Sequence, residues 1–404
     1  MNAKINIIII SVLANYFVVA QTGTYNGSGS VTQGLGTTTT ANLMPACASN
    51  HITPLGTITA TDATIWIVPA PNNFATGPFA SDLYNSCNGV TPTSLASANL
   101  TSVPTTVIDA SGDVITAYIF SDNYFEMYIN GVLVGVDPIP FTPFNSCVVK
   151  FKVSRPYTIA VKLVDWEEHL GLGSEIQSPT SQYHAGDGGF IAQFSDGTVT
   201  DATWKAQTYY IAPIENLSSV VELSNGTRST ATSTTTPSCN GNCYGIHYAA
   251  PSNWNLASYS DSGWPNATLY TATAVTNDIS YTRFATTAWP NASFIWSSNL
   301  ILDNLVLVRK TVSSLGVNQN VVSNPIRIKN PFSNTIEFSS DIDLNKAILI
   351  LFDQTGRIIQ QWNKNIILKN ETTELNSDTT ISKGIYYLTV TSEEKKYTLK
   401  IIKN

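Results

Sequence analysis

The chain has 404 residues, of which only 12% are charged, and its formal net charge is −7 at pH 7. Residues 21–311 hold 9 Lys and Arg against 19 Asp and Glu, whereas residues 312–404 hold 11 against 9. An acidic body repels polyanions, which argues against a nucleic-acid partner. Thr, Ser, Asn and Gly are abundant and runs of strong helix formers are missing, so the composition predicts an all-β protein.

The first residues have the pattern of a signal peptide. Lys4 precedes an apolar run from Ile7 to Val19, and small residues stand at the cleavage positions before Gln21. The run is too short to span a bilayer, and no other segment has the length of a membrane helix. We therefore expect a signal peptide over residues 1–20 and an exported chain without a transmembrane segment.

The composition changes again after this segment. No Asp, Glu, Lys or Arg occurs from Gln21 to Thr61, and Thr37 to Thr40 is a run of four threonines. Such uncharged, low-complexity sequence favours a flexible lead-in, which we place at residues 21–40. The expected order after it is a β-sandwich body over residues 41–311, a linker over 312–323 and a C-terminal domain over 324–404.

Two strands and a hairpin are predicted in the first half of the body. Val114 to Phe120 and Tyr124 to Ile129 have strand character, and Ser121-Asp122-Asn123 between them has turn character. Asn130-Gly131 suits a type I′ turn, which predicts a hairpin that continues into Val132 to Gly135.

Three segments of the body carry a family resemblance, and they are Asp122 to Gly135, Tyr259 to Ala267 and Leu302 to Lys310. They resemble, in turn, a strand pair, the Asp-Asp-Ser-x-Trp-x-x-Ala segment and the strand after it in galactose-binding-like jelly rolls, the ancillary domains of many glycoside hydrolases. The resemblance implies a galactose-binding-like jelly-roll sandwich. In that family the Asp-Ser-x-Trp segment usually precedes the hairpin, whereas here it follows. The body is therefore one permuted sandwich or two modules, and we expect one continuous sandwich.

The densest polar group of the chain lies between two predicted strands. The strand from Ala160 to Val164 runs into residues 165–169, and residues 183–189 lead into the strand from Phe190 to Phe194. Loops between strands often carry binding residues. The two strands can pair as antiparallel neighbours, which would bring both loops to one end of the sandwich.

A carbohydrate site is the first hypothesis for these loops. Trp166 or Tyr183 would stack on a sugar face, because aromatic surfaces with a few convergent polar groups suit small-ligand recognition. Glu167, Glu168 and Asp187 would accept hydrogen bonds from the sugar hydroxyl groups. At least two of four side chains are expected to point into the shared concavity, and these four are Glu167, Glu168, His184 and Asp187.

Two other hypotheses compete with it. A structural calcium ion would take oxygen ligands from Asp165, Glu167, Glu175 and Asp187, since hard cations bind carboxylates. In the alternative without a ligand, Trp166 belongs to the core, residues 186–189 form a turn and the glutamates face solvent.

Enzyme motifs are missing from the sequence. No Gly-x-Ser-x-Gly elbow, His-Glu-x-x-His helix, Walker loop or dinucleotide fingerprint occurs. Glu167 or Glu168 with Asp187 could supply the acid and base of a glycosidase. We expect a glycan-binding protein, with a surface structural or adhesion protein as the alternative and a glycan hydrolase after that. The remaining tryptophans are expected in the core: Trp204, Trp254, Trp264, Trp289 and Trp296.

Five cysteines remain after the predicted signal peptide. Cys239 and Cys243 are separated by Asn-Gly-Asn, which permits a tight disulfide loop in an exported chain. A metal pair with His247 is the rival hypothesis, although no second close Cys or His pair has zinc-like spacing. Two of the other three cysteines can form a second disulfide, and these three are Cys47, Cys87 and Cys147.

The C-terminal region contains three motifs in order. They are Asn330-Pro331-Phe332, a strand that ends in Asp353-Gln-Thr-Gly-Arg357, and a strand that begins Gly384-Ile-Tyr-Tyr, and the Lys-rich segment 395–403 follows them. Together they resemble the type A C-terminal sorting domain of the type IX secretion system, which belongs to Bacteroidota and related bacteria. The resemblance implies a chain that passes through the periplasm, contacts the secretion machinery, and is secreted or attached to the outer-membrane surface.

Overall fold

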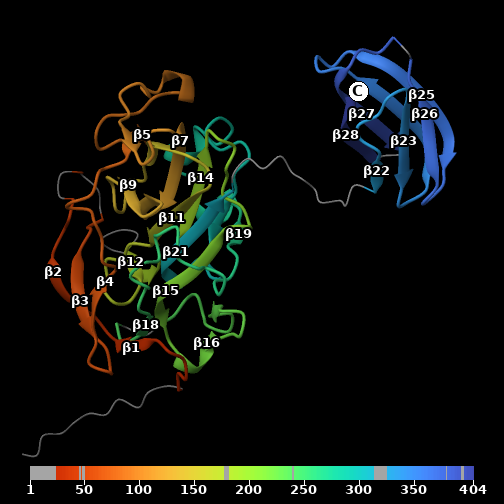
Figure 1. The fold of residues 1–404 in the computed structure, drawn as a ribbon. Coiled ribbons are helices and arrows are strands. Elements are labelled where there is room, and N and C mark those ends of the chain that lie inside the picture. The colour runs from red at the N-terminus through yellow and green to blue at the C-terminus, as the bar shows by residue number, and fades with distance from the viewer. Residues whose placement is uncertain are drawn as a thin grey trace, which may run out of the picture. The chain divides into compact units, whose positions relative to one another are not determined.

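The computed structural model describes residues 24–44, 47, 51–176, 182–238, 241–313, 325–378, 380–392 and 395–404. It divides into two compact units, residues 1–314 and 315–404 (Figure 1). Their regular secondary structure is nearly all strand, as the composition predicted. None of the helices in these residues is long and apolar enough to cross a membrane. The predicted signal peptide lies outside the described residues.

The body contains two large sheets. In the first, the strand order is β1-β18-β15-β21-β11-β8-β9, and in the second it is β19-β20-β14-β7-β10-β5, with β6 also paired to β10. The bounds in the first sheet are Ser30–Gln33 (β1), Tyr244–His247 (β18), Lys205–Ile214 (β15), Asp303–Val312 (β21), Tyr157–Val164 (β11), Tyr124–Ile129 (β8) and Val132–Val136 (β9). Those in the second are Thr268–Tyr270 (β19), Phe294–Trp296 (β20), Gly189–Phe194 (β14), Asp113–Asp122 (β7), Ser146–Val153 (β10), Ser81–Tyr84 (β5) and Thr105–Val107 (β6).

One apolar core joins the two sheets. Side chains from both, such as Ile119 of β7 and Leu163 of β11, are fully buried in a single cluster. Each side chain of this kind stabilises the fold by roughly 1.5–3 kcal/mol through burial. Strands from both halves of the sequence enter each sheet, so the body is one sandwich. The five tryptophans expected in the core are all buried: Trp204, Trp254, Trp264, Trp289 and Trp296.

The chain crosses between the sheets where the sequence predicted a turn at Ser121-Asp122-Asn123. β7 and β8 are separated only by Asn123 yet belong to different sheets. The prediction that the strand ending at Val164 pairs with the one starting at Phe190 is wrong. Both edges of β11 are occupied, by β8 and β21, so β14 pairs instead with β7 and β20. The β8–β9 hairpin is confirmed, with φ of 50° at Asn130 and 86° at Gly131.

The expected lead-in is in strands from Ser30 onward. β1 pairs with β18, and β2 (Thr37–Thr40) pairs with β3 (Leu55–Thr59), which pairs with β4 (Ile65–Val68). Threonine-rich sequence suits a pleated strand as well as a linker. Here Thr37–Thr40 forms a paired strand, where the sequence predicted a flexible lead-in. Two small sheets complete the body, β12 (Ser174–Ile176) with β13 (Tyr183–Ala185) and β16 (Val221–Glu222) with β17 (Arg228–Ser229).

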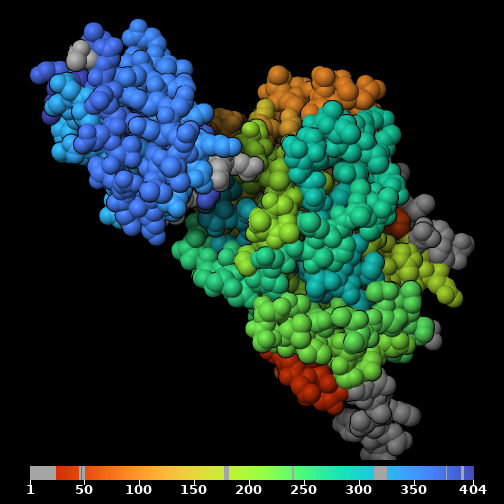
Figure 2. All heavy atoms as spheres, turned by 90° about the vertical axis from the view of Figure 1, so that its right-hand side faces the viewer, coloured from red at the N-terminus to blue at the C-terminus, as the bar shows by residue number. Residues whose placement is uncertain are grey.

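Short helical turns fill the connections. They are η1 (Leu95–Ser97), η2 (Leu217–Ser219), α1 (Ala272–Val275) and α2 (Ile279–Thr282). Tyr281 and Trp289 of the α2 region pack on the second sheet, where the Trp289 indole N–H donates to the Tyr118 carbonyl at 3.0 Å. Figure 2 shows the segment between β19 and β20 on the surface of the body.

The C-terminal unit is a smaller sandwich with its own core. One sheet has the order β22-β23-β26 and the other the order β25-β24-β27-β28. Buried Leu349, Leu388 and Phe338 belong to the cluster between them. The bounds are Ile326–Ile328 (β22), Thr335–Ser340 (β23), Leu344–Phe352 (β24), Ile358–Ile367 (β25), Thr372–Asn376 (β26), Gly384–Ser392 (β27) and Lys395–Lys403 (β28).

Two sequence motifs of this unit, at Phe332 and at Asp353 to Arg357, make contacts that stabilise its fold. Phe332 is buried, and its N–H donates to the Ile402 carbonyl at 2.9 Å, which fastens the start of the unit to β28. Asp353 accepts from the Thr355 N–H and from the Arg357 guanidinium, both at 2.9 Å, and Gly356 has φ of 81°. These bonds close the tight turn between β24 and β25. The linker expected over residues 312–323 lies mostly outside the described residues.

Candidate functional site

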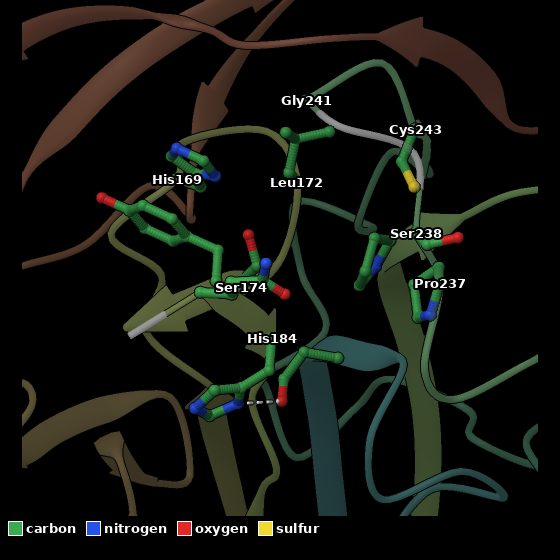
Figure 3. A pocket seen from close by; sticks show the side chains of 12 residues that line it. His169, Leu172, Ser174, His184, Pro237, Ser238, Gly241 and Cys243 are labelled. Carbon is green, nitrogen blue, oxygen red and sulfur yellow. Dashed lines mark hydrogen bonds between the residues drawn. The ribbon is translucent and has the colours of Figure 1, made fainter. Parts of the chain in front are cut away.

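A cavity of about 360 Å³ opens in the body beside the hairpin β12–β13. Figure 3 shows His169 and His184 on one side of the hollow and Pro237, Ser238 and Cys243 across from them. Its described lining also includes Leu172, Ser174, Gln182, Tyr183, Ala185, Pro213 and Gly241. Two of the predicted ligand-binding residues, Tyr183 and His184, therefore face this cavity.

A stacked ring pair forms part of the cavity wall. The rings of His169 and Tyr183 lie 3.4 Å apart between centroids with an angle of 3° between their planes. Tyr183 is still 43% exposed, and since His169 covers one face, the exposed part is the other face and the edge. Burial lowers the pKa of His169, which favours its neutral imidazole. The pair presents an uncharged, flat aromatic surface.

The loop that carries His169 and Leu172 is held by Glu167. This carboxylate is 1% exposed and accepts hydrogen bonds from the Gly171 N–H at 2.9 Å, the Gly173 N–H and the Tyr210 hydroxyl at 3.1 Å. Both glycines have positive φ, 88° and 51°, which favours glycine at these positions. Burial raises the pKa of Glu167 to about 7. Glu167 therefore shapes the cavity wall without lining the cavity.

Glu168 joins two segments rather than facing a ligand. Its carboxylate lies 3.1 Å from His51 Nδ1 and accepts from the N–H groups of Ile52 at 3.2 Å and Ile176 at 2.9 Å. Because a carboxylate has a limited number of acceptor positions, these partners commit it to the protein's own groups. The glutamates at 167 and 168 are thus positioning residues for the loops around the cavity.

Trp166 is core, so its predicted role as a sugar-stacking residue is wrong. It is 1% exposed and packs against Tyr124 edge to face, with ring centroids 5.5 Å apart and planes at 74°. It belongs to a cluster with Val164 and Phe141. Trp166 lies two residues after the end of β11 and packs within this cluster, which leaves no ring face for a ligand.

Four carboxyl groups gather behind the hairpin. The pKa values of four groups are raised, first by burial and also by neighbouring carboxylates, and these groups are Asp122, Asp165, Glu175 and Asp187. For Asp187 the value is about 7. An oxygen of Asp165 has no hydrogen-bond partner among the described residues.

The calcium site expected from Asp165, Glu167, Glu175 and Asp187 finds no support in the geometry. Among the described residues, no group of three or more His, Cys, Asp and Glu side chains could hold a metal ion. Glu167 is bonded to its own loop, and Glu175 lies opposite His184 across the hairpin, 4.0 Å from its Nδ1. Asp187 also does not line the cavity.

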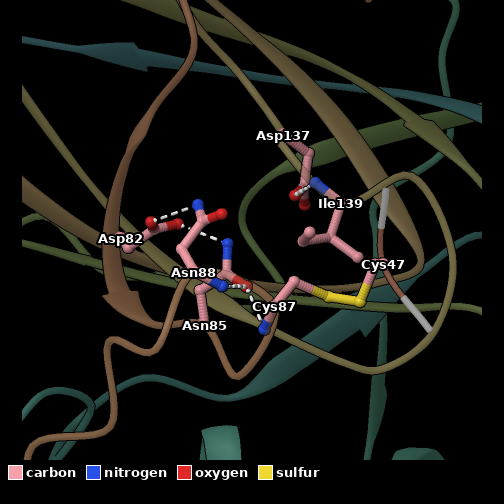
Figure 4. Close-up of a disulfide and its surroundings, with 7 residues drawn as sticks. All are labelled: Cys47, Asp82, Asn85, Cys87, Asn88, Asp137 and Ile139. Carbon is pink, nitrogen blue, oxygen red and sulfur yellow. Dashed lines mark hydrogen bonds between the residues drawn. A yellow bond between two sulfur atoms is a disulfide. The ribbon is translucent and has the colours of Figure 1, made fainter. Parts of the chain in front are cut away.

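One disulfide anchors the loops on another part of the body (Figure 4). Cys47 and Cys87 are bonded, with Cα atoms 5.3 Å apart, and Cys147 is a buried free thiol. The Asn85 side-chain oxygen accepts from the Cys87 N–H at 3.0 Å, which sets the loop after β5. This confirms a bridge between two of the three candidates. Cys239 lies outside the described residues, so the Cys239–Cys243 disulfide stays a prediction.

Part of the cavity wall could not be recognised in the sequence. Pro237, Ser238 and Cys243 come from a segment more than sixty residues after His169, and no motif links the two. Leu172 and Ser174 had a weaker signal, the pair of glycines at 171 and 173 that allows a tight loop.

Comparison with solved structures gives only weak likenesses. The apo Pleurotus ostreatus lectin is 12% identical, with coverage of 73% of this chain and 72% of the lectin and a TM-score of 0.18. The same fungus's lectin in complex with GalNAc is 12% identical, with coverage of 96% and 86% and a TM-score of 0.20. A β-D-glucuronidase of Dictyoglomus thermophilum is 12% identical over 94% of this chain and 44% of the enzyme, with a TM-score of 0.15. At these TM-scores the likenesses support no inference about this chain.

The C-terminal unit matches a known family. No curated protein matches the chain. Residues 330–404 match the family model described as the secretion system C-terminal sorting domain. This range contains the buried Phe332 and the Asp353–Arg357 turn, which account for two of the sequence motifs. The C-terminal unit is therefore a type IX sorting domain, and the protein is secreted or attached to the outer-membrane surface.

Proposed function

We propose that the body of this exported protein binds a carbohydrate in the cavity beside β12–β13. The observation that carries the proposal is the stacked pair of His169 and Tyr183, which leaves one ring face of Tyr183 partly open at the cavity. The apolar face of a sugar ring packs on such a surface. A cavity of about 360 Å³ is in the size range of small-ligand sites.

The polar groups of the wall suit hydroxyl-rich ligands. Ser174, Gln182, His184 and Ser238 supply hydroxyl, amide and imidazole groups, which both donate and accept hydrogen bonds. No Asp, Glu, Lys or Arg is among the described lining residues. A neutral ligand with many hydroxyl groups therefore fits better than a strongly charged one.

A glycan array with the purified full chain tests the proposal. We expect retention of one glycan class and a loss of about tenfold or more in affinity for Tyr183→Ala, since stacked aromatic contacts often dominate binding. The matched control is Phe79→Ala, which removes an aromatic side chain of similar exposure, 50%, from a part of the body outside the cavity lining. If a folded Tyr183→Ala variant kept its full affinity for the glycan, the binding site would lie elsewhere. If no glycan were bound by the parent chain, a structural surface protein would be favoured.

A further inference from the structure

The outer face of the larger sheet in the sorting domain is unusually apolar. Leu349 and Leu351 of β24 point into the core, so the alternating residues Ile348, Ile350 and Phe352 point outward. Phe352 pairs with Ile358 on one side and Tyr387 on the other, and Ile402 lies diagonally across from Tyr387. We call these six residues the outer patch: Ile348, Ile350, Phe352, Ile358, Tyr387 and Ile402.

Four residues of the outer patch are exposed, and Ile350 and Phe352 are half-buried. Ile348 and Ile402 are each 41% exposed, Ile358 57% and Tyr387 39%. The inner face of the same sheet already supplies the core of the unit, so folding alone gives no reason for a second apolar face. Contiguous exposed apolar surfaces of this kind mark interaction sites.

The charged side chains within the four strands of this sheet all have one sign, and Asp353, which follows Phe352, is paired with Arg357. The strands β24, β25, β27 and β28 contain six lysines and no Asp or Glu. Lys396 and Lys400 alternate with Ile402 along β28, so they project from the outer face, and Lys400 pairs with Tyr387. The surface is therefore apolar at its centre and positive along one edge.

We propose that the outer patch is the docking surface of the sorting domain for a protein of the export machinery. The partner surface that fits it carries apolar side chains at its centre and Asp or Glu along the edge that meets Lys396 and Lys400. The apolar centre supplies affinity, and the lysine edge sets orientation and association rate. A four-stranded sheet face suits a folded protein surface better than a lipid surface, which favours amphipathic helices.

Secretion of full-chain variants by a bacterium with a type IX system tests the proposal. We expect Ile348→Glu and Tyr387→Glu each to reduce the secreted fraction about tenfold, because a buried contact would be replaced by a charge. The double variant Lys396→Glu with Lys400→Glu, which reverses both edge charges, is also expected to reduce the secreted fraction. The folded protein should accumulate in the periplasm. Leu368→Glu is the matched control, since Leu368 is 49% exposed in the same unit but lies outside this sheet.

Three outcomes would contradict the docking surface. Normal secretion of the patch variants, while deletion of residues 324–404 abolishes secretion, would leave the sorting assignment intact and refute the surface. An equal loss with Leu368→Glu would make the effect non-specific. Sedimentation of the full chain with protein-free anionic vesicles, lost in Tyr387→Glu, would identify a membrane surface instead. If the glutamate variants fail to fold in thermal melts, Tyr387→Ser tests the apolar contact without an added charge.

Discussion

The imidazole of His169 and the phenol ring of Tyr183 lie face to face, with centroids 3.4 Å apart. One residue comes from the loop after β11 and the other from β13, so the pair fixes the hairpin against the loop. If Tyr183 is the surface on which a sugar stacks, His169 determines its orientation.

Removal of the supporting ring should weaken glycan binding. We expect His169→Ala to lower affinity about 2- to 10-fold, since an aromatic pair contributes roughly 0.5–1.5 kcal/mol beyond burial. His169→Phe keeps a flat ring against Tyr183 and should restore binding. Isothermal titration with the glycan found on the array measures both variants. A Phe variant as weak as the Ala variant would show that the imidazole nitrogens matter, not the stack.

Loss of the Glu167 carboxylate should destabilise the body. Glu167→Ala leaves the N–H groups of Gly171 and Gly173 and the Tyr210 hydroxyl without their acceptor, which costs about 2–5 kcal/mol. Glu167→Gln keeps the size and one acceptor oxygen, so its cost should be smaller. Denaturant unfolding at pH 7 ranks the three proteins. Equal stability of the Ala variant and the parent would contradict the role of Glu167 in holding the loop.

The sequence predicted those turns correctly that are closed by residues close together in the chain. Asn130-Gly131 predicted the β8–β9 hairpin because both residues accept positive φ, and the type I′ turn needs nothing else. The Asp353–Arg357 turn is similarly closed by its own side chains. Pairing between distant strands has no such signal, which is why β11 and β14 were wrongly expected to be neighbours.

The residues of the candidate site were also only partly predictable from the sequence. Tyr183 and His184 were recognised because they lie in a polar loop before a strand. The neighbouring Trp166, Glu167 and Glu168 have the same residue types expected of a sugar site, yet their side chains turn inward to the core and to backbone N–H groups. Sequence cannot separate an inward from an outward carboxylate when both follow the same strand.

The body should be more stable at mildly acidic pH than at pH 8. Burial raises the folded-state pKa of Glu167, Asp187 and Asp303 to about 7, above the value near 4 of an unfolded carboxyl group. The stability linked to these groups is fully present below the unfolded pKa and is lost as pH rises through the folded pKa. We expect the free energy of unfolding to fall between pH 5 and pH 8, measured with urea at both pH values.

Asp187→Asn isolates one contribution to this slope. The amide cannot ionise, so the variant should gain on the order of 1–2 kcal/mol relative to the parent at pH 8 and less at pH 5. Asp196→Asn is a poor control because Asp196 pairs with Arg155. Asp62→Asn, at an exposed aspartate whose pKa is lowered by hydrogen bonds, should leave the slope between pH 5 and pH 8 unchanged. If the free energy of unfolding had the same pH dependence in Asp187→Asn and the parent, Asp187 would not contribute to the slope.

The Cys47–Cys87 bridge should contribute strongly to stability. The bonded residues are 40 positions apart, and chain entropy for such a loop corresponds to about 4 kcal/mol. The double variant Cys47→Ser with Cys87→Ser should unfold at a lower urea concentration than the parent. The control is Cys147→Ala, which removes a buried thiol outside the bridge.

The predicted disulfide between Cys239 and Cys243 has its own test. A thiol reagent applied to the native, non-reduced protein should modify neither cysteine if the two are bonded. Modification of both would refute that predicted disulfide.

Deletion of residues 324–404 should block export while the body still folds. Residues 1–314 and 315–404 form separate compact units, and the core of the second is made of its own side chains. The body therefore loses none of its core when the sorting domain is removed. We expect the shortened protein in the periplasm, with the Cys47–Cys87 bond formed and an unchanged response of glycan binding to Tyr183→Ala. Fractionation of cells and medium measures the first result, and the array measures the second. Secretion equal to that of the full chain would show that residues 330–404, despite their family match, are not required for export of this protein.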